Sequence, residues 1–307
     1  MNYMTGSSPA YHIPVLLSQA MDGLDIRANG IYVDCTFGGG GHSAEILSHL
    51  NSEGRLYAFD QDADAKKNAL SDERFHFVPH NFRHLQRFLR LNAVSSVDGI
   101  LADLGVSSHQ FDEADRGFSI RKDAVLDMRM DNRQTLTAAT ILNSYTASDL
   151  HRIFEQYGEV SNSKTLARAI VDLRQTTTFR NVNGFRQAIN QLVKGNPNRY
   201  FAQVFQALRI EVNDEINALR ELLEQIPAVL KFGGRAAIIS FHSLEDRMVK
   251  QFFRDGTFEQ IDDLNPFGTA KTKTLRAITK KPIIPTATEL KQNPRARSAK
   301  LRVAEKA

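Results

Sequence analysis

The chain has 307 residues, of which 42% are hydrophobic, and a formal net charge of +4 at pH 7. This length suits one large domain, or one domain with an insertion, and the hydrophobic content supports a buried core. No apolar run approaches the roughly 18 residues of a membrane-spanning helix, and the N-terminus lacks a charged region followed by a hydrophobic stretch. We therefore expect a soluble protein that stays in the compartment where it is made. The single cysteine, Cys35, excludes internal disulfides and thiolate metal clusters.

The first predicted unit is a strand, a glycine loop and a helix. The apolar run from Ile31 to Val33 leads into D-C-T-F-G-G-G-G-H-S, and a helix-like segment begins at Ala44. The glycines let the backbone turn sharply and remove each Cβ that would hold a ligand away from the main chain. The helix directs unpaired amide groups at the loop. This order of elements indicates a small-molecule site.

A second strand follows at the spacing of nucleotide-binding units. The segment R-L-Y-A-F-D ends in Asp60, about twenty residues beyond the loop, where such units place an acid that accepts hydrogen bonds from ribose hydroxyls. Asp60 could instead cap the next helix, but Asp62 and Asp64 follow at once and can do so. The unit departs from the G-x-G-x-x-G fingerprint at Ser43. This departure disfavours a nicotinamide or flavin dinucleotide and favours an adenosyl cofactor without a pyrophosphate.

Two further strands precede a long helical stretch. F-H-F-V-P-H (75–80) is the third strand, and V-D-G-I-L-A-D-L-G (97–105) is the fourth, with Asp103 at its end. Asp103 lies where the reactive end of a cofactor would lie, and it is either a catalytic residue or a structural cap of its loop. His76, His80 and His84 are spaced by four, but Pro79 and the strand pattern disfavour a metal-binding helix. We predict no metal site.

From residue 106 to about 200 no strand is predicted, and from about Thr135 the pattern is helical. Helices are expected to start at Thr146, which has a capping pattern, and to cover about 164–174, 184–193 and 202–230. The sheet pattern returns with R-A-A-I-I-S-F (235–241) as a buried strand.

The predicted fold class is α/β: a Rossmann-like, doubly wound sheet with an inserted helical domain. Residues 1–110 and 201–307 would form a discontinuous cofactor-binding domain, and residues 111–200 an inserted, mainly helical substrate-binding domain. Because the strands end in polar or glycine-rich loops, their C-terminal edges should gather into one cleft.

Positive charge is concentrated in two segments. From Lys271 onward there are eleven Lys or Arg residues against two acids, a net charge of +9 that leaves −5 for the rest of the chain. Between Ser163 and Tyr200 seven basic residues face one acid, Asp172. This asymmetry indicates a polyanionic partner, with nucleic acid the leading candidate. Because the tail has no aromatic residue, it should contact phosphates without stacking on bases.

Long motifs then identify a family resemblance. The chain is similar to the bacterial ribosomal RNA small subunit methyltransferase H family over nearly its whole length. The motifs that carry the resemblance are H-I-P-V-L-L at His12, T-F-G-G-G-G-H-S at Thr36, D-G-I-L-A-D-L-G-V-S-S at Asp98, D-R-G-F-S at Asp115, L-D-M-R-M-D at Leu126, F-Q-A-L-R-I at Phe205, G-G-R-A-A-I-I-S-F-H-S-L-E-D-R at Gly233 and N-P-R-A-R-S-A at Asn293.

The resemblance implies a cytoplasmic enzyme that uses S-adenosyl-methionine to methylate the exocyclic amino nitrogen, N4, of a decoding-centre cytosine in 16S ribosomal RNA of the small subunit. It also implies the cofactor-binding residues: Gly40, Gly41, His42, Asp60, Phe82, Asp103 and Gln110. The loop amides would hold the methionine part and Asp60 the ribose, while the Phe82 ring would lie against adenine. Asp103 and Gln110 would border the transferred methyl group.

Three questions stay open from the sequence. The fourth strand lacks the D/N-P-P-Y/F motif of many amino-directed methyltransferases, so Asp103 is only the first choice for the catalytic hydrogen-bond acceptor. Arg295 and Arg297 either contact RNA phosphates or fasten the C-terminus to buried carboxylates. The alternative functions are a non-catalytic RNA-binding assembly factor and a nicotinamide-dependent dehydrogenase.

Overall fold

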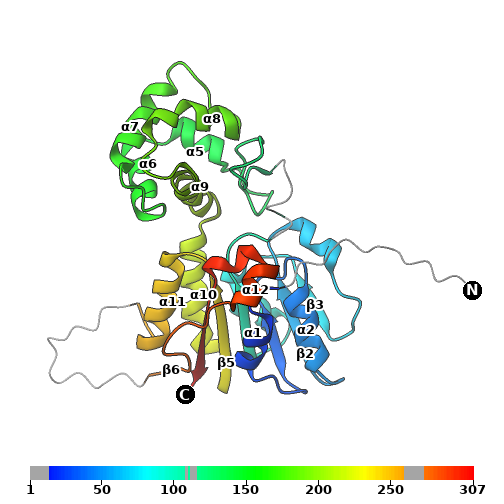
Figure 1. Cartoon of the computed structure of the whole chain (residues 1–307). Helices are drawn as coiled ribbons and strands as arrows, with labels where there is room; N and C mark the ends of the chain where they lie inside the picture. Colours follow the sequence, from blue (N-terminus) through cyan, green and yellow to red (C-terminus); the bar gives the residue numbers. More distant parts are fainter. Residues whose placement is uncertain (1–13, 108–109, 111–115, 259–272) are drawn as a thin grey trace, which may run out of the picture.

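The computed structural model describes residues 14–107, 110, 116–258 and 273–307. Its described residues form one seven-stranded sheet with the order β3-β2-β1-β4-β5-β7-β6 (Figure 1). The strands are β1 Ile31–Asp34, β2 Arg55–Phe59, β3 Phe75–Val78, β4 Val97–Asp103, β5 Leu230–Ser240, β6 Leu275–Ala277 and β7 Lys300–Lys306. The predicted Rossmann-like α/β class is therefore confirmed.

The strand pairing places a ligand crevice at one edge of the sheet. β1 to β5 are parallel, and β1 pairs with β2 on one side and with β4 on the other. The strand order therefore reverses between β1 and β4, and open α/β sheets bind ligands outside the carboxyl ends of the strands at this point. The glycine loop follows β1 and Asp103 ends β4, so both lie at this crevice.

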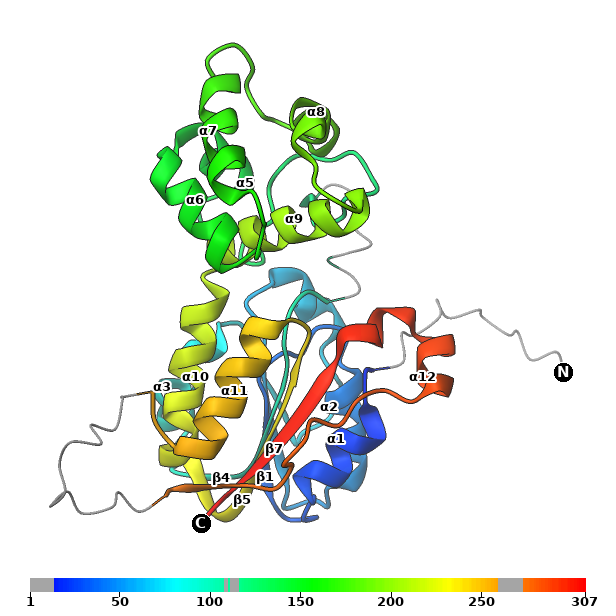
Figure 2. The ribbon, with the colours of Figure 1, turned by 60° about the vertical axis from the view of Figure 1, so that its left-hand side comes forward.

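Helices cover both faces of the sheet (Figure 2). On one face, side chains of α1 (Leu17–Leu24) and α2 (Gly41–His49) share a core with the sheet. On the other face, α3 (Leu85–Leu91), α10 (Glu215–Val229) and α11 (Ser243–Asp255) contribute to a second core. The shorter elements around the sheet are η1 Ala63–Asn68, η2 Phe82–His84, α12 Ala287–Gln292 and η5 Pro294–Ser298. No helix of the described ranges is long and apolar enough to cross a membrane.

The segment between β4 and α10 forms a separate helical body that stands above the C-terminal edge of the sheet in Figure 1. Its helices are α5 Ala138–Ser144, α6 Ala147–Gln156, α7 Ser163–Leu173, α8 Val182–Ala188, η4 Asn190–Leu192 and α9 Pro197–Asn213. They enclose a hydrophobic core of their own. Thr146 caps α6 by accepting a hydrogen bond from the Asp149 amide at 3.1 Å, as the sequence predicts. In the described part of this body the chain makes only an isolated bridge, Val125 to Asn181, and no strand.

The predicted single helix over 202–230 is wrong. The chain breaks at Asp214, whose φ of 51° and ψ of 39° are left-handed. Side chains of α9 such as Phe205 and Leu208 pack in the core of the helical body, whereas Leu222 and Ile226 of α10 pack against the sheet. The amphipathic pattern runs through both helices, so periodicity alone does not reveal the break. We propose that the second domain boundary lies at Asp214 rather than near residue 200.

The C-terminal segment contains two strands that the sequence does not predict. β7 lies antiparallel between β5 and β6, and its Leu301 to Ala304 are buried. Four basic residues of the predicted phosphate-binding tail have partners within the protein. Lys300 and Arg302 pair with Asp246 at 3.1 and 2.7 Å, Arg276 pairs with Glu305 at 2.6 Å, and Lys306 donates to the Leu230 carbonyl at 2.7 Å. High positive charge thus coexists with strand formation because these charges are paired; Lys271 lies outside the described residues.

Candidate cofactor and methyl-transfer site

The glycine loop between β1 and α2 has the open backbone that the sequence predicts. Gly38 and Gly40 have φ values of 51° and 79°, which favour glycine. A Cβ added at Gly39 would meet no atom within 4 Å, so this part of the loop faces open space. Gly41 is needed for another reason, because a Cβ there would lie 2.4 Å from the Pro14 ring. The loop therefore exposes main chain at its centre and packs tightly at the start of α2.

A buried carboxylate, that of Asp34, fixes the shape of the glycine loop. Asp34, the last residue of β1, accepts hydrogen bonds from the Ser43 hydroxyl at 2.7 Å and from the Thr36 amide at 3.0 Å. Burial raises its pKa. Asp34 thus ties the strand end to α2 and sets the loop's shape. The sequence reasoning did not assign it a role, although an acid directly before a glycine loop is a readable signal.

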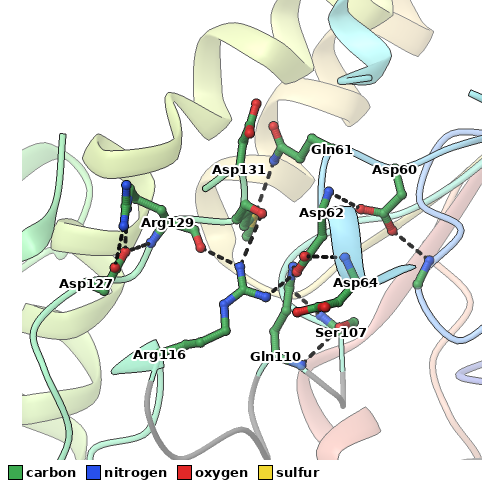
Figure 3. Close-up of polar contacts among 12 residues, drawn as sticks. Asp60, Gln61, Asp62, Asp64, Ser107, Gln110, Arg116, Asp127, Arg129 and Asp131 are labelled. Atoms are coloured by element: carbon green, nitrogen blue, oxygen red, sulfur yellow. Dashed lines mark hydrogen bonds and ion pairs between the residues drawn. The ribbon is translucent and has the colours of Figure 1, made fainter. Parts of the chain in front are cut away.

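Asp60 lies beside the loop at the end of β2. Its carboxylate accepts hydrogen bonds from the Gly38 amide and from the Asp62 amide, each at 2.8 Å (Figure 3). Burial raises the pKa of Asp60 to about 6, and the two amide bonds oppose that shift. Each carboxylate oxygen can accept a further hydrogen bond, so Asp60 retains acceptor capacity for a ligand. The two amides fix the Asp60 carboxylate and leave part of its surface accessible, as the binding of a ribose would require.

Asp103 ends β4 across the crevice from the loop. Its side chain is 24% exposed, and its Oδ2 lies 3.8 Å from Nδ1 of His42. Its Oδ1 is buried and has no hydrogen-bond partner among the described residues. Burial raises the pKa of Asp103 to about 6, with His42 acting in the opposite direction. A buried acceptor without a donor is costly, and it points to a hydrogen-bond donor supplied by a ligand.

His42 is fixed by the N-terminal segment. Its Nε2 lies 3.0 Å from the Val15 carbonyl, which can only accept, so Nε2 carries a proton. Nδ1 is then the nitrogen that faces Asp103, at 3.8 Å from Oδ2, which is beyond hydrogen-bond distance. His42, a predicted cofactor residue, thus lies between the N-terminal segment and Asp103.

Phe82 and Gln110 complete the set of predicted cofactor residues. Phe82 begins η2, a short turn after the end of β3 at Val78, and its half-buried ring packs against the core of the sheet. Gln110 is buried, accepts from the Ser107 amide at 3.0 Å and donates to Asp62 at 2.7 Å. Its amide is therefore already hydrogen-bonded on both sides. We infer that Gln110 shapes the wall of the crevice with its side-chain body.

The sequence reasoning missed a polar cluster centred on Asp62. Asp62 does cap η1, as expected, by accepting from the Asp64 amide at 3.1 Å. Its other oxygen accepts from Gln110 and from the guanidinium of Arg116, and its side chain is 4% exposed (Figure 3). Arg116 belongs to D-R-G-F-S, one of the motifs of the family resemblance, so the signal was present without a role attached.

The predicted RNA-binding arginines lie at the same edge of the sheet. Arg295 and Arg297 are exposed residues of η5, and the pairing of Ser240 with Lys300 places η5 where β5 ends, next to the end of β4. α12, just before η5, contacts the N-terminal segment, because Glu289 accepts from the Leu16 amide at 2.7 Å. Lys300 and Arg302 also attach the C-terminal segment to a carboxylate, because both pair with Asp246.

The three histidines do not gather. His76 stacks on Tyr57 at 4.8 Å between ring centroids, and His80 stacks on Phe88 at 4.3 Å. No group of three or more potential metal-ligating residues occurs within the described ranges.

The residues present fit an adenosyl cofactor that carries a sulfonium. The crevice combines an open glycine backbone, an acid after β2 with spare acceptor capacity, and a buried carboxylate oxygen after β4 that lacks a donor. Its acids at Asp34, Asp60 and Asp103 suit a ligand that brings hydroxyl, ammonium and sulfonium groups and no pyrophosphate. A glycine loop and acids arranged in this way at the carboxyl ends of parallel strands are typical of the class of nucleoside-cofactor-binding α/β proteins.

The comparisons with known proteins agree with that class. The model of the MraW methylase family matches residues 9–307, and the chain belongs to this family. It is 52% identical over 305 residues to the ribosomal RNA small subunit methyltransferase H of Parabacteroides distasonis, covering 99% of this chain and 100% of the relative. Relatives of the same name from Flavobacterium psychrophilum and Cytophaga hutchinsonii are 51% and 52% identical; the matches cover 95% and 96% of this chain, and 100% and 99% of the relatives. The predicted family and the predicted S-adenosyl-methionine-dependent methyltransferase activity are thereby confirmed.

Proposed function

We propose that this protein methylates N4 of a decoding-centre cytosine in the 16S ribosomal RNA of the small ribosomal subunit, and that it acts in the cytoplasm. The observation that carries the proposal is the full-length identity of about half to relatives named ribosomal RNA small subunit methyltransferase H. The unpartnered Oδ1 of Asp103 at the crevice supports the amino-directed chemistry. Family membership disfavours the dehydrogenase alternative.

Each predicted cofactor residue has a specific task in this proposal. Asp60 accepts hydrogen bonds from the ribose hydroxyls, the amides at Gly40 and Gly41 face the methionine part, and the ring of Phe82 lies against adenine. His42 restricts the orientation of Asp103, and Gln110 forms the wall beside Asp62. S-adenosyl-methionine, when bound, supplies an electrophilic methyl group on a positively charged sulfur.

The protein's main chemical task is to improve a poor nucleophile. The lone pair of the cytosine amino group is delocalised into the ring, so the nitrogen must be held in line and must rehybridise. Oδ1 of Asp103 accepts a hydrogen bond from that amino group and helps to localise the lone pair. As the new nitrogen–carbon bond would form, the bond from the methyl group to sulfur would break, and one amino proton would pass from the nitrogen to the Asp103 carboxylate. A carboxylate whose pKa is raised to about 6 is ionised at neutral pH and is a better proton acceptor than an ordinary aspartate.

The RNA is held by cations on the helical body and at η5. Exposed basic side chains on the helical body are Lys164, Arg168, Arg180, Lys194 and Arg199. Together with Arg295 and Arg297 they would contact phosphates and contribute affinity without base specificity. The target cytosine must turn out of its surroundings to reach Asp103, because a paired or stacked base cannot enter the crevice.

One experiment separates the enzyme from an RNA-binding assembly factor. The protein is incubated with S-adenosyl-methionine labelled in the methyl group and with small subunits from cells that lack the enzyme. We expect label on the amino nitrogen of a single 16S cytosine. RNA binding without transfer to RNA, subunit or protein would instead support the assembly factor.

A further inference from the structure

A buried ion pair joins the cofactor side of the crevice to the segment that leads into the helical body. Asp62 follows Asp60 by two residues, and Arg116 lies 54 residues further along the chain. Their side chains are 4% and 13% exposed, so neither charge is well solvated. A surface ion pair would count for little, but a buried charge that loses its partner is strongly destabilising. This pair is therefore an energetically important contact between the two segments.

On one side the connection reaches the ribose-binding acid. The Asp62 amide donates to Oδ1 of Asp60 at 2.8 Å, and the Asp62 carboxylate accepts from Gln110 at 2.7 Å. Both Asp60 and Gln110 are predicted cofactor residues. The position of Asp62 therefore sets the position of two groups in the cofactor pocket.

On the other side the connection reaches the helical body. The second terminal nitrogen of Arg116 donates to the carbonyls of Arg129 and Met130, at 2.6 and 3.2 Å (Figure 3). Met130 is held in turn by Asn213, whose side chain accepts from the Met130 amide at 2.7 Å and donates to the Met128 carbonyl at 2.8 Å. Asn213 is the last residue of α9, directly before the break at Asp214. This series of hydrogen bonds, with the Asp62–Arg116 ion pair at its centre, thus runs from Asp60 to the point where the helical body joins the sheet.

The geometry requires arginine at position 116. The guanidinium is planar and presents donors on separate nitrogens, so one side chain can contact a carboxylate and two carbonyls at once. A lysine ammonium is a compact point charge on a flexible stem and cannot span the same acceptors. Arg116 also lies over the Phe118 ring at 5.6 Å, which further restricts its orientation.

We propose that Arg116 is a positioning residue that couples the cofactor pocket to the RNA-binding helical body through Asp62. A ligand that hydrogen-bonds to Asp60 orders the turn from Asp60 to Asp62, and RNA bound to the helical body orders the carbonyls that hold Arg116. When one ligand has ordered this path, the other loses less conformational entropy on binding. The two ligands therefore bind cooperatively. The inference rests on the proposed function for its RNA ligand.

The test measures cooperativity on the full chain. The affinity of S-adenosyl-homocysteine, which cannot donate a methyl group, is determined by calorimetry with and without small subunits from cells lacking the enzyme. For the unsubstituted protein we expect RNA to tighten binding at least about fivefold, the lower end of typical couplings. Arg116→Lys should bring this ratio close to one. A ratio close to one in the unsubstituted protein, or an unchanged ratio in Arg116→Lys, would overturn the proposal.

Two further variants keep the test decisive. Arg74→Lys is the matched control, because the Arg74 side chain makes a similar two-point pair with Asp72 and does not contact Asp62. It should keep the cooperativity, and a loss equal to that of Arg116→Lys would show a general structural effect instead. If Arg116→Lys does not fold, Asp62→Asn replaces it, with the same expected loss of cooperativity. Methyl transfer by the unsubstituted protein is assayed in parallel, so a failure of the proposed function is seen separately.

Discussion

The sheet edge and the helical body place their candidate functional groups in opposite environments. At the sheet edge Asp34, Asp60 and Asp103 are carboxylates whose pKa values burial raises, and backbone amides or hydroxyls hold two of them. On the helical body the candidate groups are exposed cations such as Lys164 and Arg168. The effects of the buried carboxylates are confined to one site and depend on pH. Exposed charges act additively and depend on salt. The predictions below test this contrast.

The largest effect is expected at Asp103. Asp103→Asn keeps the shape of the side chain but removes the charge and the proton-accepting capacity of Oδ1. Acid–base groups contribute about 100- to 10,000-fold to rates, so single-turnover methyl transfer should fall within that range. Rates are measured with small subunits from cells lacking the enzyme. A variant rate within threefold of the unsubstituted protein would remove Asp103 as the acceptor.

The next largest effect is expected at Asp60. Asp60→Ala removes charge-assisted hydrogen bonds worth about 1.5–3 kcal/mol, which corresponds to roughly 10- to 150-fold weaker cofactor binding. Calorimetry with S-adenosyl-methionine measures the change. Lys164→Ala, on the helical body, serves as the control and should leave cofactor affinity as it is. Equal affinities for Asp60→Ala and the unsubstituted chain would exclude Asp60 from the site.

The raised pKa of Asp60 makes a smaller, pH-dependent prediction. Because ribose hydroxyls donate to the ionised carboxylate, cofactor affinity should be flat above the pKa of about 6 and fall about tenfold per pH unit below it. Asp60→Asn should flatten this dependence. Calorimetry at pH 5, 6 and 7 gives the comparison, and a profile in the unsubstituted protein that is flat down to pH 5 contradicts the assignment.

Protein stability should change with pH in the opposite direction to cofactor affinity. A carboxyl group with a pKa raised from 3.8 to about 6 binds its proton more tightly in the folded chain. The free energy of unfolding should therefore decrease as pH rises from about 4 to 6, by up to about 3 kcal/mol for each of Asp60 and Asp103. Urea denaturation of Asp60→Asn and Asp103→Asn across this range isolates their contributions from those of other acids.

The smallest effect concerns the exposed arginines. Replacing Arg295 and Arg297 together by alanine should flatten the slope of log RNA affinity against log salt by roughly 1.5, at about 0.7–0.9 per phosphate. The melting temperature should fall less than it does in Arg302→Ala. Arg302→Ala is the matched contrast, because Arg302 is buried and paired with Asp246, so it should lower the melting temperature and leave the salt slope unchanged. The reverse pattern would mean that Arg295 and Arg297 hold the C-terminus in place.

Local patterns determined β1 to β5 of the sheet and much of the candidate site. β1, β2, β3 and β4 follow apolar runs, and the glycine loop, Asp60 and Asp103 stand directly after strands, where parallel pairing brings them to one edge. Thr146 and Asn196 begin their helices because each accepts a hydrogen bond from an amide three residues on. All of these features depend on neighbours in sequence or on a general rule of strand order.

Only the tertiary structure decided the features that depend on distant partners. β7 is a strand because β5 and β6 flank it and Asp246 pairs with its Lys300 and Arg302. From the sequence alone, the positive charge of this segment indicated a phosphate-binding tail and gave no sign of a strand. The chain breaks at Asp214 because α9 and α10 pack in different cores. Asp62 meets Arg116 across 54 residues, and neither side chain carries a local signal of the other. Periodicity records which face of an element is buried, but the partner that buries it is set by the fold.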